Sequence, residues 1–220
     1  HQPLLKRSDV LQLISESSFN ICIAGTHGKT TISTMTAHIL RHTGYGCNAF
    51  LGGIAANYGT NFWSHERNVA VIEADEYDRS FLKLSPDIAV ISAMDADHLD
   101  IYGTAAEMEK AFIAFAGKVK PGGVLFAQSD LERGEELQAP RKLTYELQNK
   151  KADFFATGLI AKEGAYQYTV VSNSWVLENV TLNMGGLHNV ENSLAAIAIA
   201  HELGIEDNSI REAVSAFKGV

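Results

Sequence analysis

A glycine-rich run at residues 25–31, Gly-Thr-His-Gly-Lys-Thr-Thr, constrains the fold of this chain more than any other feature. The apolar run before it, residues 19–24, predicts a short buried strand, and residues 29 to about 42 predict a helix. Glycines at a strand-to-helix turn let the backbone wrap around phosphate oxygens, and the N–H groups of the first helical turn point at the anion. The sequence therefore predicts a nucleotide-phosphate loop formed by Gly25, Thr26, His27, Gly28, Lys29, Thr30 and Thr31.

The last part of the loop carries the groups that act on phosphate. A lysine at this position reaches the β- and γ-phosphates, and the hydroxyl after it ligates Mg²⁺, which assigns these roles to Lys29 and Thr30. The strict pattern G-x-x-x-x-G-K-[ST] requires glycine at position 23, where this chain has Ile23, so the loop is a variant. The alternative is a glycine-rich turn with an incidental Gly-Lys-Thr, which the flanking strand and helix disfavour.

The middle of the chain alternates between strand and helix signals. Residues 69–72 and 88–91 are near-continuous apolar runs, as expected for parallel strands covered on both faces. A helix is expected at 105–118 and a strand at 124–127, and Ser129 is expected to cap a further helix. This order predicts an α/β fold, a P-loop-type doubly wound and mostly parallel sheet.

Both ends of the chain and one internal segment differ from this pattern. Residues 1–18 predict an entry helix with Ser8 as its N-cap, and helices are expected at 192–203 and 210–217. Residues 152–184 instead contain hairpin-like segments at 154–160, 165–171 and 175–182, which predict a small antiparallel β appendage. Residues 1–220 are expected to form one ATP-binding domain around the loop at 25–31.

Acidic residues follow two of the predicted strands. Glu73 comes directly after the apolar run 69–72, and four acids lie within residues 73–78. Because ligands of open α/β sheets bind at the carboxyl ends of strands, Glu73 is a candidate magnesium ligand. His98, flanked by acids in 95–100, is a second candidate metal ligand, and a capping or packing role for it stays open.

The composition restricts the classes of partner. The formal net charge is −8, so no broad basic field exists to neutralise a nucleic-acid backbone, and no nucleic-acid partner is expected. The two cysteines, Cys22 and Cys47, lie in apolar stretches and are expected to be reduced core residues. No apolar run approaches the ~20 residues of a membrane helix and no signal-peptide pattern is present, so a cytoplasmic protein without a membrane partner is expected.

Four motifs follow one another along the chain: the loop at 25–31, Glu-Ala-Asp-Glu-Tyr-Asp-Arg-Ser-Phe at 73–81, Asp-His-Leu-Asp-Ile-Tyr at 97–102 and His-Asn-Val-Glu-Asn at 188–192. Together they resemble the Mur ligases of peptidoglycan synthesis. The resemblance covers essentially the whole chain but only the central ATPase domain of the family. It implies that an N-terminal UDP-binding domain and a C-terminal ligase domain are absent, and that this segment alone does not ligate.

The resemblance also implies roles for individual residues. Lys29 and the loop amides would bind the phosphates of ATP, Thr30 and Glu73 would hold one Mg²⁺, and His98 would serve a second metal ion. The adenine would be contacted by His188, Asn189 and Asn192. The Gly52-Gly53 pair would lie near the sugar substrate.

The implied reaction activates a carboxylate. The branch of the family that is most similar joins L-alanine to UDP-N-acetylmuramate: the substrate carboxylate attacks the γ-phosphate of ATP, and the amine of L-alanine then attacks the acyl phosphate. Several family members use a carbamylated lysine as a metal ligand, but residues 111–113 near that position are Ala-Phe-Ile, with Lys110 only nearby. Its absence favours the alanine-adding branch.

Three alternatives stay open. The run 73–78 also suits the recycling ligase that attaches a tripeptide to the same nucleotide sugar, although Asp-His-Leu-Asp-Ile-Tyr at 97–102 favours alanine addition. A nucleotide-gated binding module would use the loop to bind nucleotide and change conformation without catalysing ligation. The acidic strand ends and the 188–192 motif disfavour this alternative. A folylpolyglutamate synthetase-like ligase is disfavoured by the Thr-His within the loop. The oligomeric state is not predicted.

Overall fold

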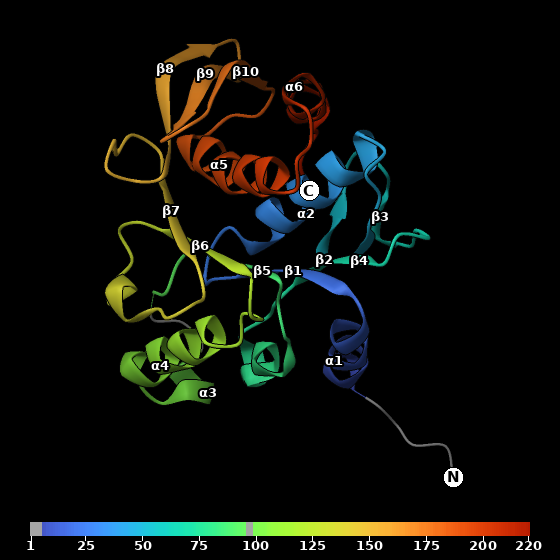
Figure 1. The fold of residues 1–220 in the computed structure, drawn as a ribbon, viewed down its shortest axis with the longest axis vertical. Coiled ribbons are helices and arrows are strands. Elements are labelled where there is room, and N and C mark those ends of the chain that lie inside the picture. Colours follow the sequence, from blue (N-terminus) through green and yellow to red (C-terminus); the bar gives the residue numbers. More distant parts are fainter. Residues whose placement is uncertain (1–5, 96–98) are drawn as a thin grey trace.

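One mostly parallel sheet of ten strands organises the part of the chain that the computed structural model describes, residues 6–95 and 99–220 (Figure 1). Across the sheet the strand order is β10-β9-β8-β7-β6-β5-β1-β4-β2-β3. In chain order the strands are β1 (Phe19–Ala24), β2 (Asn48–Ala55), β3 (Thr60–Trp63), β4 (Val69–Glu73), β5 (Ile88–Ile91), β6 (Val124–Gln128), β7 (Lys142–Glu146), β8 (Phe154–Lys162), β9 (Ala165–Ser172) and β10 (Val176–Leu182).

Helices cover both faces of this sheet, so the predicted doubly wound α/β fold is confirmed (Figure 1). One face packs against α2 (Lys29–His42), α5 (Leu187–Glu202) and α6 (Asp207–Ala216), and the other against α1 (Arg7–Ser17) and α4 (Ala105–Ala116). The short elements are α3 (Leu99–Tyr102) and two 3₁₀ segments, η1 (Tyr77–Lys83) and η2 (Gly134–Glu136).

The central strand β1 shows why its sequence forms a buried parallel strand. Successive side chains point to opposite faces, so Ile21 and Ile23 join one apolar core while Cys22 and Ala24 join the other. Both neighbours of β1, β4 and β5, run parallel to it. The chain crosses to one side of β1 first and to the other side afterwards, which makes the carboxyl end of β1 a topological switch point, where ligands of such sheets bind.

The antiparallel segment is confirmed as strands but is continuous with the main sheet. β8, β9 and β10 pair antiparallel with one another, as expected from the hairpin signals at 154–182. β8 also pairs in parallel with β7, with Tyr145 opposite Phe154. The appendage therefore extends the central sheet, as the upper strands in Figure 1 show.

Several local predictions differ from the structure. The expected helix after Ser129 is wrong: Ser129 Oγ bonds the Glu146 carboxylate, and a turn leads to the short η2. The entry helix begins at Arg7 with Lys6 as its N-cap, rather than at Ser8, because the Asp9 carboxylate accepts the Lys6 backbone N–H at 3.0 Å. The strands β2, β3 and β7 were not predicted.

The two cysteines are free and buried, as expected, and burial raises the pKa of both thiols. Within residues 6–95 and 99–220, no helix combines the length and the apolar character that crossing a bilayer requires.

Candidate functional site

The glycine-rich loop turns sharply between β1 and α2. Gly25 has φ of 135° and Gly28, the N-cap of α2, has φ of 82°, and both angles favour glycine. A Cβ on Gly25 would lie 2.2 Å from Ser92 Oγ and 2.8 Å from the backbone nitrogen of Ala93. The space beside β5 therefore requires glycine at position 25.

Hydrogen bonds fasten the loop to the segment that follows β5. The Thr26 N–H donates to the Ala93 carbonyl at 3.1 Å, and the Thr26 hydroxyl accepts from the Asp95 N–H at 3.2 Å. Ser92 Oγ donates to the His27 carbonyl. The His27 ring lies at the surface, with Nε2 3.7 Å from the Asp95 carboxylate. These contacts hold the loop backbone in one shape without using the N–H groups of the first helical turn.

The variant position of the loop has a structural explanation. Ile23 is fully buried in β1, and its carbonyl accepts the N–H of Ala74 at 2.8 Å. The strand therefore continues past the position where the strict pattern has its first glycine. Gly25 makes the turn instead, and the loop is correspondingly shorter.

Lys29 is held by two acceptors on different elements. Its Nζ donates to the Gly25 carbonyl at 2.7 Å, which closes the loop on itself. It also pairs with the Glu76 carboxylate at 2.8 Å, and the two side chains are only 14% and 1% exposed. The structure thus brings Lys29 into the loop as expected, and adds a partner that the sequence analysis did not identify.

Glu76 is itself fixed from its backbone. The hydroxyl of Tyr102 donates to the Glu76 carbonyl at 2.6 Å. Tyr102 is buried, and that burial, together with the nearby Glu76, raises its pKa to about 12. The hydroxyl consequently stays protonated and donating at neutral pH.

Glu73 lies at the end of β4 and faces the first turn of α2. One carboxylate oxygen accepts from the Thr30 hydroxyl at 2.9 Å, and the other from Ser33 Oγ at 3.2 Å and from the Gly52 N–H at 2.8 Å. Thr30 and Ser33 are three residues apart and so share one face of the helix. The predicted pair of Thr30 and Glu73 is therefore brought together, with Ser33 as an additional contact that only this helical spacing could have suggested.

Gly52 and Gly53 approach these two residues closely. A Cβ on Gly52 would lie 2.3 Å from Glu73 Oε1, and one on Gly53 would lie 2.9 Å from Thr30 Cγ2. Side chains larger than hydrogen would displace the carboxylate or the threonine. The two glycines thus leave room for the Thr30–Glu73 pair.

The second predicted metal ligand is His98. His98 lies outside the described residues. Among the residues that are described, no three His, Cys, Asp or Glu side chains form a cluster suited to a metal ion. The oxygen pair of Thr30 and Glu73 is therefore the described candidate for holding a cation.

The 188–192 motif lies at the start of α5, one element away from the loop. A Cβ on Gly28 would lie 2.6 Å from Oδ1 of Asn192, so Asn192 packs directly against the loop. Asn189 is buried, and its amide donates to the Gly185 carbonyl at 2.7 Å. His188 is exposed at the first turn of the helix. The structure thus brings Asn192 to the loop, while Asn189 has a local partner and His188 faces solvent.

Comparisons with known proteins agree with this geometry. A family model described as the Mur ligase middle domain matches residues 23–200. A UDP-N-acetylmuramate–L-alanine ligase from Phocaeicola vulgatus is 44% identical over 216 residues, which are 98% of this chain and 47% of that protein. One from Porphyromonas gingivalis is 40% identical over 218 residues, 98% of this chain and 48% of that protein. The chain spans about half the length of these relatives.

Solved structures give the same result. The UDP-N-acetylmuramate:L-alanyl-γ-D-glutamyl-meso-diaminopimelate ligase from Neisseria meningitides superposes with a TM-score of 0.86 at 25% identity, over 99% of this chain and 72% of that one. The UDP-N-acetylmuramate–alanine ligase from Thermotoga maritima gives 0.80 at 29% identity, over 97% of this chain and 47% of that one. With the family match over residues 23–200, these likenesses show that the chain belongs to the Mur ligase family, whose middle domain it contains.

Proposed function

We propose that this chain provides the ATP site of a ligase that joins L-alanine to the carboxylate of UDP-N-acetylmuramate in peptidoglycan synthesis. The observation that carries the proposal is the arrangement at the start of α2, where Lys29 and Thr30 meet carboxylates from the strand end beside them. The choice of UDP-N-acetylmuramate as acceptor and of L-alanine as amino acid is based on the similar proteins from P. vulgatus and P. gingivalis, which are both named UDP-N-acetylmuramate–L-alanine ligase.

The loop would bind the triphosphate of ATP. The N–H groups of the first turn of α2 are free of the contacts that hold residues 25–28, and they carry the positive end of the helix dipole. Lys29 adds a full positive charge at the same place. Asn192, packed against Gly28, is in position to contact the nucleotide together with His188 and Asn189.

Thr30 and Glu73 would hold Mg²⁺. A hydroxyl and a carboxylate are the hard oxygen donors that Mg²⁺ prefers, and here they already lie 2.9 Å apart at the phosphate end of the loop, so the residues present fit the ion. When bound, the ion would neutralise charge on the transferring phosphoryl group. His98 remains the proposed ligand of a second ion.

The chemistry asks the protein mainly to position reactants. A carboxylate oxygen of the acceptor attacks the γ-phosphorus, the bond to the ADP oxygen breaks, and the amine of L-alanine then displaces phosphate from the acyl carbon. No protein nucleophile is needed, because the acceptor itself supplies the attacking oxygen. Dependence on ATP and UDP-N-acetylmuramate favours the cytoplasm as the place of reaction.

The test is phosphate release by the full-length ligase that contains this segment. Release should require UDP-N-acetylmuramate, L-alanine and Mg²⁺ together, and the product should be the alanyl nucleotide by mass spectrometry. ATP hydrolysis that ignores both acceptor and amino acid would instead support a nucleotide-gated module.

A second candidate has its own support. The structural likeness to the ligase from N. meningitides favours addition of a tripeptide, L-alanyl-γ-D-glutamyl-meso-diaminopimelate, to the same nucleotide sugar. A competition between L-alanine and this tripeptide at equal concentration distinguishes the two, because only the preferred amine will appear in the product.

A further inference from the structure

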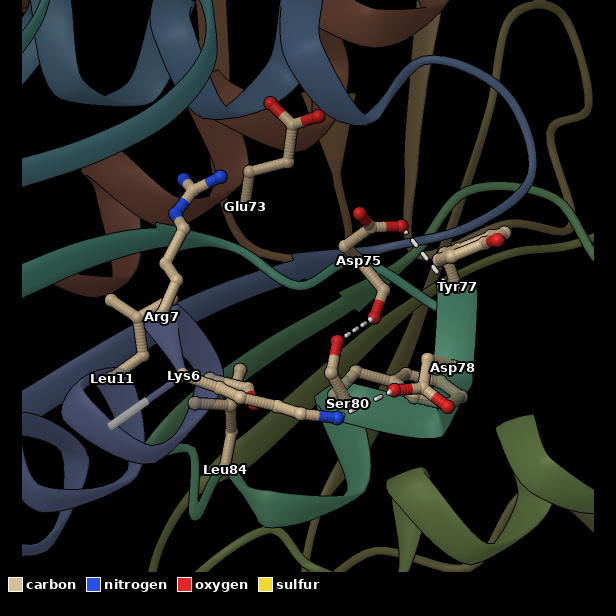
Figure 2. A pocket seen from close by; sticks show the side chains of 11 residues that line it. Lys6, Arg7, Leu11, Glu73, Asp75, Tyr77, Asp78, Ser80 and Leu84 are labelled. Carbon is tan, nitrogen blue, oxygen red and sulfur yellow. Dashed lines mark hydrogen bonds and ion pairs between the residues drawn. The ribbon is translucent and has the colours of Figure 1, made fainter. Parts of the chain in front are cut away.

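A cavity of about 250 Å³ lies at the carboxyl end of β4, between the start of α1 and η1 (Figure 2). Its lining includes Glu73, the proposed magnesium ligand, together with two cations, Lys6 at the N-cap of α1 and Arg7 at its first residue, and two further carboxylates, Asp75 and Asp78. The cavity is therefore continuous with the proposed phosphoryl-transfer site and carries both signs of charge.

The two cations of this cavity are in different situations. Lys6 pairs with the Asp78 carboxylate at 3.6 Å. Arg7 makes no ion pair or hydrogen bond through its guanidinium with any residue of the described chain, and Figure 2 shows its side chain rising from α1 toward Glu73. One guanidinium in the cavity is thus left with its donors available.

Glu73 has no need of Arg7 as a partner. Its two oxygens already accept from Thr30, Ser33 and the Gly52 N–H. The start of α1 is held in place separately, because Lys83 of η1 pairs with Asp9 at 2.6 Å and donates to Ser8 at 3.3 Å. Arg7 is consequently positioned by its neighbours and stays available to an incoming anion.

The three carboxylates of the cavity would repel an anionic substrate. Arginine presents planar, permanently charged donors that match a carboxylate, and such charge-assisted bonds are stronger than neutral ones. Arg7 is therefore the group of this lining best suited to attract an anion that enters beside Glu73, Asp75 and Asp78.

We infer that Arg7 binds the acceptor carboxylate that is to be activated, through one of its oxygens. The inference rests on the proposed function. The other oxygen stays free to attack the γ-phosphorus, the bond to the ADP oxygen breaks, and Arg7 keeps all its protons. The carboxylate is the anionic group assigned here, rather than the diphosphate of the same substrate, because only the reacting carboxylate must come within about 3–3.5 Å of the phosphate beside Glu73.

The test compares two ligands on the full-length ligase by calorimetry. UDP-N-acetylmuramate carries the carboxylate, whereas UDP-N-acetylglucosamine has the same diphosphate and sugar without the lactyl group. Arg7→Ala should weaken binding of the first about 10- to 100-fold, as expected for a hydrogen bond to a charged group, and leave the second unchanged. Arg7→Lys should recover part of the loss, with KM for the acceptor rising and KM for ATP unaffected.

Lys6→Ala is the matched control, since it removes the same charge from the same cavity but from a side chain that already has a partner. It should change both affinities by less than about threefold, in line with a surface ion pair. Equal weakening of both ligands by Arg7→Ala would assign Arg7 to the diphosphate and overturn the inference, as would unchanged binding of UDP-N-acetylmuramate. Arg7→Gln, which keeps the first three carbons of the side chain, replaces Arg7→Ala if the latter unfolds at a lower temperature.

The outcome can be separated from failure of the proposed function. If the parent protein neither binds UDP-N-acetylmuramate nor consumes ATP in its presence, the proposed function fails. If the parent does both and Arg7→Ala behaves like it, only the role of Arg7 fails.

Discussion

Two regions of the molecule are held together by different physics. The phosphate-loop edge, residues 25–31 with Glu73 and Glu76, depends on buried polar contacts between segments about 45 residues apart in sequence, such as Lys29–Glu76. The β8–β10 arm, residues 154–182, depends on interdigitating apolar side chains that are at most 1% exposed: Tyr168, Val170, Leu177, Val180 and Leu182. The loop edge is therefore stabilised mainly by charged and polar contacts, and the arm mainly by apolar packing.

The two regions meet through α6. This helix packs against β10 of the arm and against α2 behind the loop. His38 of α2 makes the polar contact there: Nε2 is 2.8 Å from the Ala213 carbonyl and Nδ1 is 2.9 Å from the Tyr58 hydroxyl. Substitutions in the two regions should therefore change different quantities, turnover at the loop edge and the free energy of unfolding in the arm. His38 lies where the two regions meet.

The largest expected effect is at the loop edge. Lys29→Met should lower kcat of the full-length ligase about 10³-fold, because it removes the cation proposed to stabilise the transferring phosphate. It should also lower the free energy of unfolding by about 3 kcal/mol, since the buried Glu76 carboxylate loses the positive charge of Lys29 beside it. Steady-state kinetics and urea titration measure the two quantities.

Adding Glu76→Gln to Lys29→Met separates these effects. The double variant should regain most of the stability and none of the turnover. Recovery of turnover along with stability would mean that Lys29 acts only as a structural ion-pair partner. The loop edge would then contribute stability in the same way as the arm.

In the arm, Leu182→Ala should cost about 3 kcal/mol of unfolding free energy, because it leaves a cavity at a fully buried site. Thr181→Ala, the neighbouring half-buried position on the same strand, is the control and should change stability by less than about 0.5 kcal/mol. The kcat of the folded protein should stay at the parent value in both. A drop in kcat for Leu182→Ala at temperatures where the variant is fully folded would show that packing in the arm affects the loop edge.

At the junction, His38 should make stability depend on pH. Burial, with a smaller contribution from the neighbouring His42, lowers the pKa of His38 from 6.5 to about 4 in the folded protein. Between pH 6.5 and 4, His38 is protonated in the unfolded chain but stays neutral in the folded protein. The contribution of His38 to the free energy of unfolding is therefore complete above pH 6.5 and is lost as the pH falls toward 4. The loss should be of order 3 kcal/mol across this window.

Urea titrations at several pH values between 7 and 4.5 measure this dependence. His38→Asn should be less stable at pH 7 and should show a flatter pH dependence than the parent. An unchanged slope would assign the dependence to other groups.

The smallest expected effect is in the loop backbone. Gly28→Ala should weaken ATP binding about tenfold, because alanine at a φ of 82° costs about 1–2 kcal/mol and its Cβ would lie 2.6 Å from Oδ1 of Asn192. Comparing Asn192→Ala with the double variant Gly28→Ala/Asn192→Ala isolates the backbone part, because both variants lack the Asn192 side chain and with it the steric clash and the proposed nucleotide contact. Calorimetry with ATP measures the two affinities. Parent-like affinity for Gly28→Ala alone would mean that the loop changes shape on binding.

Local signals account for what could be predicted from the sequence. The helix after the loop has the predicted bounds, Lys29–His42, because its apolar pattern and the glycine before it are features of neighbouring residues. The arm was predicted for the same reason, since glycine, asparagine and serine separate its strands. β7 was missed, because Lys-Leu-Thr-Tyr-Glu alternates and does not resemble the continuous apolar runs of the other central strands.

Contacts between distant segments account for the rest. The Lys29–Glu76 pair joins residues 47 positions apart, and the chain after Glu76 turns through Asp78 and Arg79 with φ of 55° at both. Glu73 could be distinguished in the sequence by its place directly after the apolar run 69–72, whereas no local signal identified Glu76 as the partner of Lys29. Arg7 likewise has no distinguishing sequence signal, because its cavity is made by two elements more than sixty residues apart.

The Lys29–Glu76 pair has a consequence for which nucleotides can bind. With Glu76 in place, the lysine is already neutralised, so an arriving ligand must compete with an internal carboxylate for the same cation. A single phosphate offers little more charge than Glu76 does, whereas a triphosphate offers several negative charges at once. If Lys29 binds the phosphates of ATP as proposed, Glu76 would act as an internal competitor for this cation and would favour ATP over AMP before any contact with the adenine is made.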